Sequence, residues 1–184
     1  IEIRDTDHLF YQLNEFQSEL EIHSSGRQNV WKPNVRAMTK NWLNMGLRPR
    51  AVTRDLEWGI DVPIQDKEWA NKRVYVWFEA VQGYYTCAKI WSERFASEHP
   101  DGDSAWENWW IDKPGQSLKH IYFMGKDNIP FHTIIWPAIL MGLNRSRDSN
   151  ELLHLEDNVA ANEYLMLQGG QFSKSRKHGV WLPA

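Results

Sequence analysis

Cysteine is almost absent from this chain, because Cys87 is the only one among 184 residues. A single thiol excludes an intrachain disulfide and fits a reducing, cytoplasmic compartment. A cysteine zinc cluster is excluded for the same reason, so we expect no zinc site within these residues. Because Cys87 lies in an apolar helical stretch, we expect a packed and inert thiol.

Long apolar runs are also lacking, and none approaches 18 residues, so nothing predicts export or a membrane-spanning helix. The chain has no excess of basic charge, since 21 Lys and Arg stand against 24 Asp and Glu for a net charge of -3. This balance argues against a general nucleic-acid coat, and any contact with a polyanion must be local. Because the chain starts at Ile1 and stops at Ala184, we expect a fragment of a longer protein.

Tryptophan is abundant, with 11 residues, and hydrophobic residues make up 42% of the chain. This composition predicts a folded protein with one sizeable domain, or one domain with a small lobe. Most of the tryptophans should be core residues, but so many leave room for an aromatic pocket that stacks on a ligand.

Helical spacing follows a short strand that begins near His8, and the helix should end at Gly26. A second helix is expected from Pro33, a good first-turn residue, to about Met45, with Gly46 as its stop. The segment AVTRDLEWGIDVPI predicts irregular backbone without a helix or strand. A third short helix is expected near residues 104–110, with Ser104 as its cap.

The segment RVYVWFEA, residues 73–80, is rich in aromatic and β-branched residues and predicts a strand, followed by a helix from about Val81 to Phe95. HIYFMG, residues 120–125, predicts a buried strand that runs into the helix KDNIPFHTIIWPAILMG. One or two short strands should follow in residues 152–170. A strand, a tight turn and a helix form the βα element of an α/β fold with a parallel sheet flanked by helices.

Several residues near these strand ends are candidates for a ligand site, because ligands bind in the crevice at the carboxyl ends of parallel strands. Asp127 either binds a ligand there or caps its own helix. His132 and Trp136 share a helix face, and Phe131 is adjacent, so the three either form an aromatic wall or belong to the core. A carboxylate beside aromatic rings suits a ligand with an ammonium group and a soft, apolar side chain.

Two further segments each contain a residue with two possible roles, in a ligand pocket or in ordinary structure. Trp77 should alternate with Tyr75 and Glu79 on one strand face, either in a pocket or in ordinary sheet packing. Arg54 either forms a surface ion pair with the adjacent aspartate at position 55 or reaches into the pocket and holds Asp127.

The segment GGQFSKSRKHG, residues 169–179, is glycine-flanked, basic and rich in hydroxyls. It lacks the spacing of a Walker loop, so the chain is not a P-loop enzyme. A flexible lysine loop of this kind can close over a triphosphate, where Lys174 would meet charge that develops on the transferring phosphorus.

Taken in order, these segments resemble the methionyl-tRNA synthetase family of class I aminoacyl-tRNA synthetases. The matching segments, which cover nearly the whole chain, are EIRDTDHLFYQL, KPNVRAMTKNWL, VTRDLEWGIDVP, YVWFEAVQGYY, YFMGKDNIPFHTIIWPAILMG and GGQFSKSR. The resemblance implies the second half of a class I Rossmann-type nucleotide-binding fold. Residues 1–30 would then be the exit from the connective insertion, and residues 31–184 the second half of the catalytic domain.

The resemblance also implies a function and a set of site residues. Methionine and ATP, with Mg²⁺ on the triphosphate, would give methionyl-adenylate, and the methionyl group would pass to the 3′ end of tRNA(Met). Lys174 matches the second lysine of the Lys-Met-Ser-Lys-Ser loop and would be catalytic, with Ser173, Ser175, Gly169 and Gly170 binding ATP. The residues that would bind methionine are Arg54, Trp77, Ala80, Tyr84, Asp127, Phe131, His132 and Trp136.

Four positions depart from the family pattern: Gln171 and Phe172 in the loop, and Val81 and Gln82 in the segment after Ala80. The motif His-Ile-Gly-His, which binds ATP in the first half of class I catalytic domains, is absent from the sequence. We therefore expect the 184 residues alone to be inactive. A class I synthetase for leucine, isoleucine or valine, or a non-catalytic synthetase-like binding module, stays as an alternative.

Overall fold

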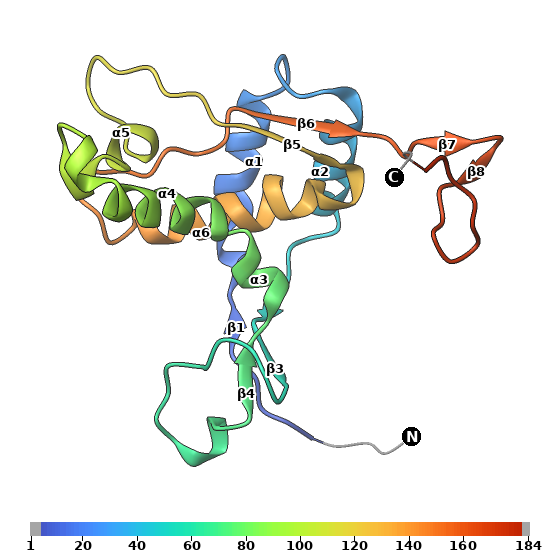
Figure 1. Ribbon diagram of the computed structural model, residues 1–184, viewed down its shortest axis with the longest axis horizontal. Coiled ribbons are helices and arrows are strands. Elements are labelled where there is room, and N and C mark those ends of the chain that lie inside the picture. Colours follow the sequence, from blue (N-terminus) through green and yellow to red (C-terminus); the bar gives the residue numbers. More distant parts are fainter. Residues whose placement is uncertain (1–4, 182–184) are drawn as a thin grey trace.

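The computed structural model describes residues 5–181 and centres on two parallel strands, β5 (Ile121–Gly125) and β6 (Asn158–Asn162) (Figure 1). Ile121 pairs with Asn158 and Gly125 with Asn162. The connection between the strands contains α6 (Trp136–Asn144), as a parallel pair requires a long crossover. This confirms the α/β class and the expected strand–helix element. The predicted domain limits at residues 1 and 184 lie outside the described residues.

The sequence predicts one helix over residues 126–142, and the structure builds it from three kinds of turn. A 3₁₀ turn (Lys126–Asn128) and a π turn (Phe131–Ile135) precede α6. The N–H of Trp136 donates to the carbonyl of Phe131, five residues back. Because Pro137 has no N–H to donate, the backbone pattern can change there at little cost.

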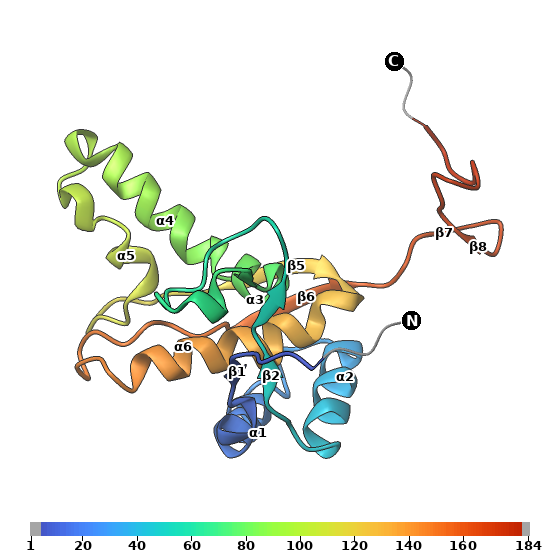
Figure 2. The same cartoon turned by 90° about the horizontal axis from the view of Figure 1, so that it is seen from below.

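Helices α1 (Gln17–Gly26) and α2 (Pro33–Asn44) lie on one side of the parallel pair, as Figure 2 shows. Leu13 and Leu20 are buried with Leu43 and Ile134 in one apolar cluster, and each fully buried leucine contributes about 1.5–3 kcal/mol. Both helices, their limits at Gly26 and Pro33, and the stop at Gly46, where φ is +75°, confirm the sequence prediction.

Helices α4 (Gly83–Arg94) and α5 (Glu107–Trp110) lie away from α1 and α2 (Figure 2), but both groups cover the same face of the pair. Tyr122 clusters with Trp110, and its strand partner Val159, on the same face, clusters with Val35 of α2. The largest core cluster joins these helices to β5 and α6, through Val81, Trp110, Tyr122, Trp136 and Leu140. The short helix near residues 104–110 exists, but Ser104 does not cap it. It begins after Trp106, and no side chain bonds its first turn.

Short antiparallel pairs form an extension from this body (Figure 1). The strand expected near His8 is limited to β1 (Phe10–Tyr11), which pairs with β2 (Arg50–Ala51). β3 (Thr53–Asp55) pairs with β4 (Lys72–Val74). The expectation of irregular backbone from residue 51 onward is therefore wrong for β2 and β3, whose pairing depends on partners far away in the sequence. A last hairpin joins β7 (Met166–Leu167) to β8 (Gly170–Gln171).

The strand predicted over residues 73–80 is wrong beyond Val74, because α3 (Val76–Ala80) begins there. The pairing with β3 ends at Thr53, which lies opposite Val74. Just beyond it, the carbonyl of Val52 accepts the last hydrogen bond between the two segments, from Tyr75 N–H. Later N–H groups have no strand beside them and bond within the helix instead, beginning with Phe78 N–H to the Tyr75 carbonyl at 2.8 Å. A helical turn also places Phe78 and Val81 on one side, against the core.

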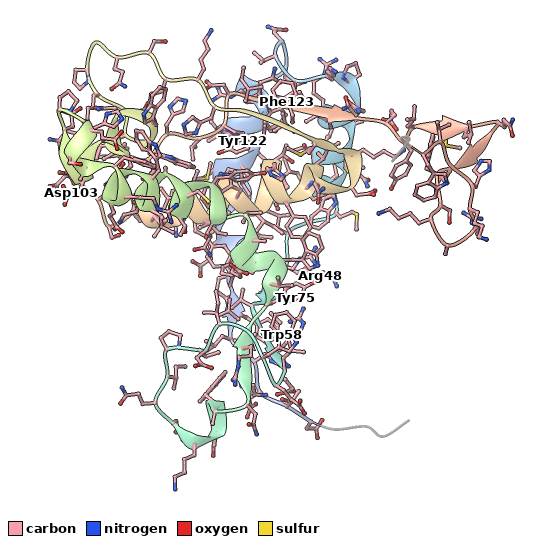
Figure 3. The ribbon with its side chains drawn as sticks, in the orientation of Figure 1. Arg48, Trp58, Tyr75, Asp103, Tyr122 and Phe123 are labelled. Carbon is pink, nitrogen blue, oxygen red and sulfur yellow. The ribbon has the colours of Figure 1, made fainter. Side chains whose placement is uncertain are left out.

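Two burial predictions are also wrong. Cys87 is exposed, because α4 turns its opposite side to the core. β5 was expected to be buried, yet only Tyr122 is, and Phe123 is 79% exposed (Figure 3). Alternate side chains of a strand point to opposite faces, and only one face of β5 is covered in the described residues.

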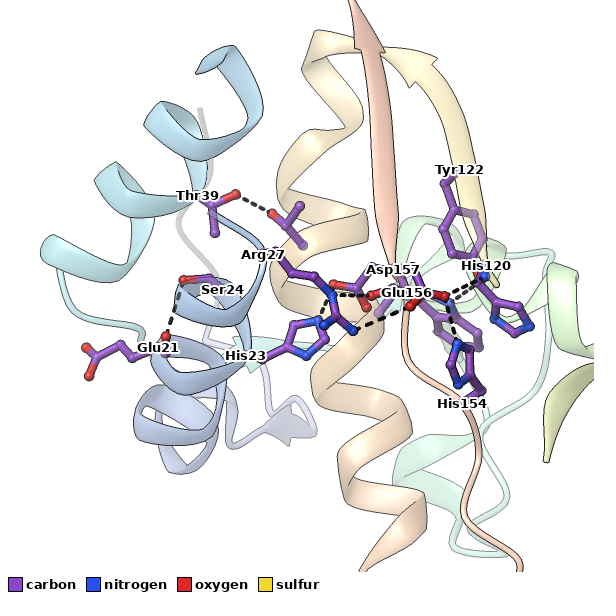
Figure 4. A network of polar contacts seen from close by, with 12 residues as sticks. Glu21, His23, Ser24, Arg27, Thr39, His120, Tyr122, His154, Glu156 and Asp157 are labelled. Atoms are coloured by element: carbon purple, nitrogen blue, oxygen red, sulfur yellow. Dashed lines mark hydrogen bonds and ion pairs between the residues drawn. The ribbon is translucent and has the colours of Figure 1, made fainter. Parts of the chain in front are cut away.

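A network of polar side chains connects α1 to the segment that leads into β6 (Figure 4). His23 Nε2 lies 2.8 Å from an oxygen of Glu156, whose side chain is fully buried. Arg27 donates to the Glu156 carbonyl oxygen at 3.2 Å. On the other side, His154 Nε2 lies 2.8 Å from Asp157, which accepts from the backbone N–H of His120 at 2.9 Å. The network fixes the entry to β6 on both sides.

Candidate active site

An aromatic surface lies where α3, α4 and the start of the α6 segment meet. Trp77, Ala80 and Tyr84 recur at helical spacing along α3 and α4. The sequence predicts a strand for Trp77 and Ala80, which is wrong, and a helix for Tyr84, which is confirmed. The ring centroids of Trp77 and Phe131 are 5.7 Å apart. Trp77 and Tyr84 are both about half exposed, so their rings are available to a ligand.

His132 is held in one tautomer by its two neighbours. Its Nδ1 lies 2.8 Å from the carbonyl oxygen of Asn128, which only accepts, so Nδ1 carries the hydrogen. Its Nε2 lies 3.0 Å from the Tyr84 hydroxyl and therefore accepts from it. Burial lowers the pKa of His132, which favours this neutral ring. The site thus presents a half-exposed phenol, with a buried, neutral imidazole behind it.

Trp136 lies behind this surface and not on it. It is 1% exposed, and its Nε1–H donates to the Tyr122 hydroxyl at 3.0 Å. Tyr122 in turn packs against Tyr84, with ring centroids 4.9 Å apart. The sequence left two interpretations open, an aromatic wall or core residues. The structure places Trp136 in the core, and His132 is buried as well, at 6% exposure. Tyr122 was missed as a contact of the site, although its place in a strand just before Asp127 was visible.

Asp127 lies just after β5 and is exposed, as the crevice argument predicts. It does not cap its helix, because no side chain bonds the first turn. Instead its carboxylate accepts a hydrogen bond from Tyr164, which follows β6. Lys126 Nζ lies 2.7 Å from Glu163 and 4.5 Å from the centre of the Tyr164 ring. These contacts join the carboxyl ends of the two strands, and no pattern in the sequence indicated Tyr164.

Arg54 forms neither of the two pairs considered from the sequence. Its guanidinium lies 4.0 Å over the Tyr75 ring and donates to the carbonyls of Ala51 and Thr53. Asp55 pairs with Lys72 at 2.6 Å, and that contact lowers the pKa of Asp55. Arg54 does share a cavity of about 230 Å³ with Phe131, which places it beside the aromatic surface.

The glycine-flanked loop is an ordered β-turn structure at the end of the β7–β8 hairpin. Gly169 has a φ of +80°, and a side chain at Gly170 would meet the His178 ring at 3.0 Å, so both positions favour glycine. Ser173 and His178 exchange backbone hydrogen bonds of 2.8 and 3.0 Å, which closes the loop. Lys174 lies at its exposed tip.

The structure brings some of the expected residues together and leaves others apart. Trp77, Tyr84, Phe131 and His132 form one surface, Ala80 is exposed on the same helical face, and Asp127 lies at the neighbouring strand end. The β7–β8 hairpin stands away from the body (Figures 1 and 2). In residues 5–181 no hydrogen bond or ring contact joins Lys174, Ser173 or Ser175 to the aromatic surface.

Between residues 5 and 181 no helix is both long and apolar enough to cross a membrane. The same residues contain no group of three His, Cys, Asp or Glu side chains close enough to hold one metal ion.

The comparisons with known proteins all indicate the same family. The family model described as "tRNA synthetases class I (M)" matches residues 1–184. The methionine–tRNA ligase of Roseiflexus sp. (strain RS-1) is 45% identical over 186 residues, which cover 100% of this chain and 29% of that protein. The methionine–tRNA ligase of Thermoplasma volcanium is 45% identical over 97% of this chain and 30% of its own length. The chain therefore spans less than a third of these relatives.

A solved structure also resembles this fold. Mycobacterium tuberculosis methionyl-tRNA synthetase in complex with methionyl-adenylate is 25% identical, with a TM-score of 0.65. The similarity covers 91% of this chain and 28% of that one. This agrees with the Rossmann-type α/β class expected from the sequence.

Proposed function

We propose, from the fact that this chain belongs to the class I tRNA synthetases of the methionyl type, that it forms part of the catalytic domain of a methionine–tRNA ligase. The reaction is the ATP-dependent activation of L-methionine to methionyl-adenylate, followed by transfer of the methionyl group to the 3′ end of tRNA(Met). The observation that carries the proposal is the aromatic surface of Trp77, Tyr84, Phe131 and His132 at the end of β5.

The chemistry of this surface suits methionine. A thioether contacts aromatic rings favourably, and Trp77 and Phe131 supply two of them. Tyr84 and the neutral His132 ring add a polar edge without a charge, so the apolar side chain meets no ion in this part of the site. Asp127, at the neighbouring strand end, provides the carboxylate that an ammonium group requires. Arg54 contributes from the cavity that it shares with Phe131.

We assign the loop at residues 169–179 to ATP. Lys174 is the cation that meets charge on the transferring phosphate groups, and the hydroxyls of Ser173 and Ser175 are donors beside it. Gly169 and Gly170 allow close approach of the backbone to the nucleotide. In the reaction, the methionine carboxylate attacks the α-phosphorus of ATP, the bond to the β-phosphate oxygen breaks, and pyrophosphate leaves.

Magnesium fits this assignment as a companion of the triphosphate. The loop offers two lysines, an arginine and two serine hydroxyls but no carboxylate of its own, so the phosphate oxygens and water would be the main ligands of the ion. When bound, Mg²⁺ neutralises charge on the phosphates. The chain's part is to bind and orient the triphosphate through Lys174.

The division of the chain follows from the same proposal. Residues 1–30 correspond to the exit from a connective insertion, and residues 31–184 to the second half of the catalytic domain. The first half would carry the His-Ile-Gly-His motif, which this sequence lacks. We accordingly expect no methionine-dependent pyrophosphate exchange from the 184 residues alone.

Isothermal titration of L-methionine into this chain, with L-leucine as the control, tests the proposed site. Binding of methionine without binding of leucine supports it. Binding of leucine with equal or higher affinity favours the alternative, a class I synthetase for an aliphatic amino acid. If neither binds, the titration is repeated on the full-length protein. If neither amino acid binds to the full-length protein, or if methionine binds without pyrophosphate exchange, the result supports a non-catalytic synthetase-like module.

A further inference from the structure

One stretch of this acidic chain is entirely free of acidic residues. Residues 22–54 contain seven of the 21 Lys and Arg residues and none of the 24 Asp and Glu residues. The stretch contains the end of α1, all of α2 and the strands that follow. A local basic surface on a chain with a net charge of -3 marks a contact with something anionic.

Two of the seven cations are engaged on other parts of the chain, near Asp157 and beside the aromatic surface. Arg27 pairs with Asp157 at 3.8 Å, and Arg54 lies over Tyr75. The other five form what we call the basic ridge: Lys32, Arg36, Lys40, Arg48 and Arg50. Among the described residues, no carboxylate lies within ion-pair distance of any of them.

The ridge is ordered by helix geometry. Lys32, Arg36 and Lys40 recur every four residues, so they line one side of α2. Arg48 and Arg50 continue the ridge beyond the end of the helix at Gly46, and the Arg50 guanidinium lies 4.7 Å over the Trp42 ring. At about 1.5 Å per residue, the span from Lys32 to Lys40 extends these charges over roughly 12 Å.

A groove of about 610 Å³ runs between α1 and α2 beside this ridge. Arg36 and Lys40 line it, together with Trp31 and Asn44, and Glu21 is the only carboxylate among its lining residues. Trp31 is 3% exposed, and its indole N–H has no hydrogen-bond partner within residues 5–181. The groove therefore combines two cations with a buried donor that is unpaired.

We propose that the basic ridge and this groove form a docking surface for the sugar–phosphate backbone of RNA, namely the tRNA substrate. The identity of the RNA rests on the proposed function, whereas the surface itself rests on the charge distribution. Arginine, lysine and side-chain amides are the usual donors to phosphate oxygens, and such contacts position a nucleic acid without reading its sequence. The α2 part of the ridge lies away from α4 and α5 (Figure 2), and only Arg50, at the far end of the ridge, lines the cavity that Phe131 of the aromatic surface also lines.

Charge-matched variants of the 184-residue chain test this surface. The ridge variant is K32Q/K40Q/R48Q, and the control variant is K67Q/R94Q/K119Q, which removes the same number of lysines and arginines from other exposed positions. The probe is a fluorescein-labelled tRNA(Met) transcript, followed by anisotropy at several salt concentrations. Circular dichroism checks that both variants are folded.

We expect the ridge variant to bind tRNA roughly tenfold more weakly near 0.15 M salt, with the slope of log affinity against log salt reduced by about 2. The control variant should stay within about twofold of wild type. Equal losses in both variants, or no tRNA binding by the wild-type chain at low salt, would overturn the inference. Competition by poly-L-glutamate as effective as that by unlabelled tRNA would also overturn it and indicate an acidic protein partner.

The methionine titration separates this inference from the proposed function. If methionine binds but the ridge variant retains full tRNA affinity, only the docking surface is wrong. If tRNA binding depends on the ridge but methionine does not bind even to the full-length protein, the surface stands as an RNA-binding surface and the proposed function fails.

Discussion

The hydroxyl of Tyr84 lies 3.0 Å from Nε2 of His132 and is the donor in that hydrogen bond. The bond joins α4 to the π turn that precedes α6, two elements separated by 48 positions in the sequence. It fixes the ring orientation of His132 and keeps its Nε2 as an acceptor. The neutral character of the aromatic surface therefore depends on a single phenol.

Replacement of Tyr84 by phenylalanine should destabilise the chain by about 1 kcal/mol, because the buried Nε2 of His132 loses its donor. Tyr85→Phe is the matched control, since it removes from the next residue of α4 a hydroxyl that makes no hydrogen bond within the described residues. Urea unfolding of the two variants measures the difference. Equal stabilities would show that the Tyr84–His132 bond contributes nothing to the folded state.

The stability of the chain should fall in mildly acidic solution, partly through His132. Burial holds the pKa of His132 below its ordinary value of 6.5, so the unfolded chain binds this proton more strongly than the folded chain. The contribution of His132 is complete above about pH 6.5 and is lost as the pH falls through the window between the unfolded and the folded pKa. Burial lowers the pKa of His120 too, which acts in the same direction.

Urea unfolding at pH 7.5 and pH 5.5 tests this effect in the wild type and in His132→Gln. The variant should lose less stability between the two pH values than the wild type, because one of the titrating groups is gone. An identical pH dependence in both proteins would mean that the protonation of His132 is not coupled to folding.

Loss of His23 should be costly because of the carboxylate that it pairs with. Glu156 is fully buried, and the described residues offer no partner for its Oε2 (Figure 4). His23→Ala leaves that carboxylate without its 2.8 Å contact, and we expect a loss of about 3 kcal/mol in the free energy of unfolding. The double variant His23→Ala, Glu156→Met should recover more than half of this loss. A double variant less stable than the single one would contradict the argument.

Local sequence signals predicted the helices well and the strands poorly. α2 has a proline in its first turn and a glycine after its end, so both limits are encoded nearby. The segment from Arg73 to Ala80 has strand composition throughout. Its pairing with β3 ends where Val74 lies opposite Thr53, and only the tertiary structure reveals this limit. The strand propensity of a segment does not indicate whether a partner strand lies beside it.

The candidate site shows the same limit. His132 and Phe131 could be selected from helical spacing, but the spacing did not distinguish surface from core for Trp136, which is buried against Tyr122. Tyr164 reaches Asp127 across the ends of two parallel strands, a contact between residues 37 positions apart that follows from strand register. Contacts of that kind are not encoded in any local pattern.

The role of Lys174 is the sharpest test of the proposed chemistry. In the full-length protein, Lys174→Ala should lower the rate of methionyl-adenylate formation by roughly 10²–10³, as expected for the loss of one preorganised group at the transition state. Lys177→Ala is the control, because Lys177 is an exposed lysine of the same loop, three residues away. Methionine-dependent pyrophosphate exchange measures both variants. A larger effect on kcat than on the KM for ATP would indicate that Lys174 acts mainly in the transition state. An unchanged rate would remove Lys174 from the mechanism, and equal losses in both variants would assign the effect to the charge of the loop as a whole.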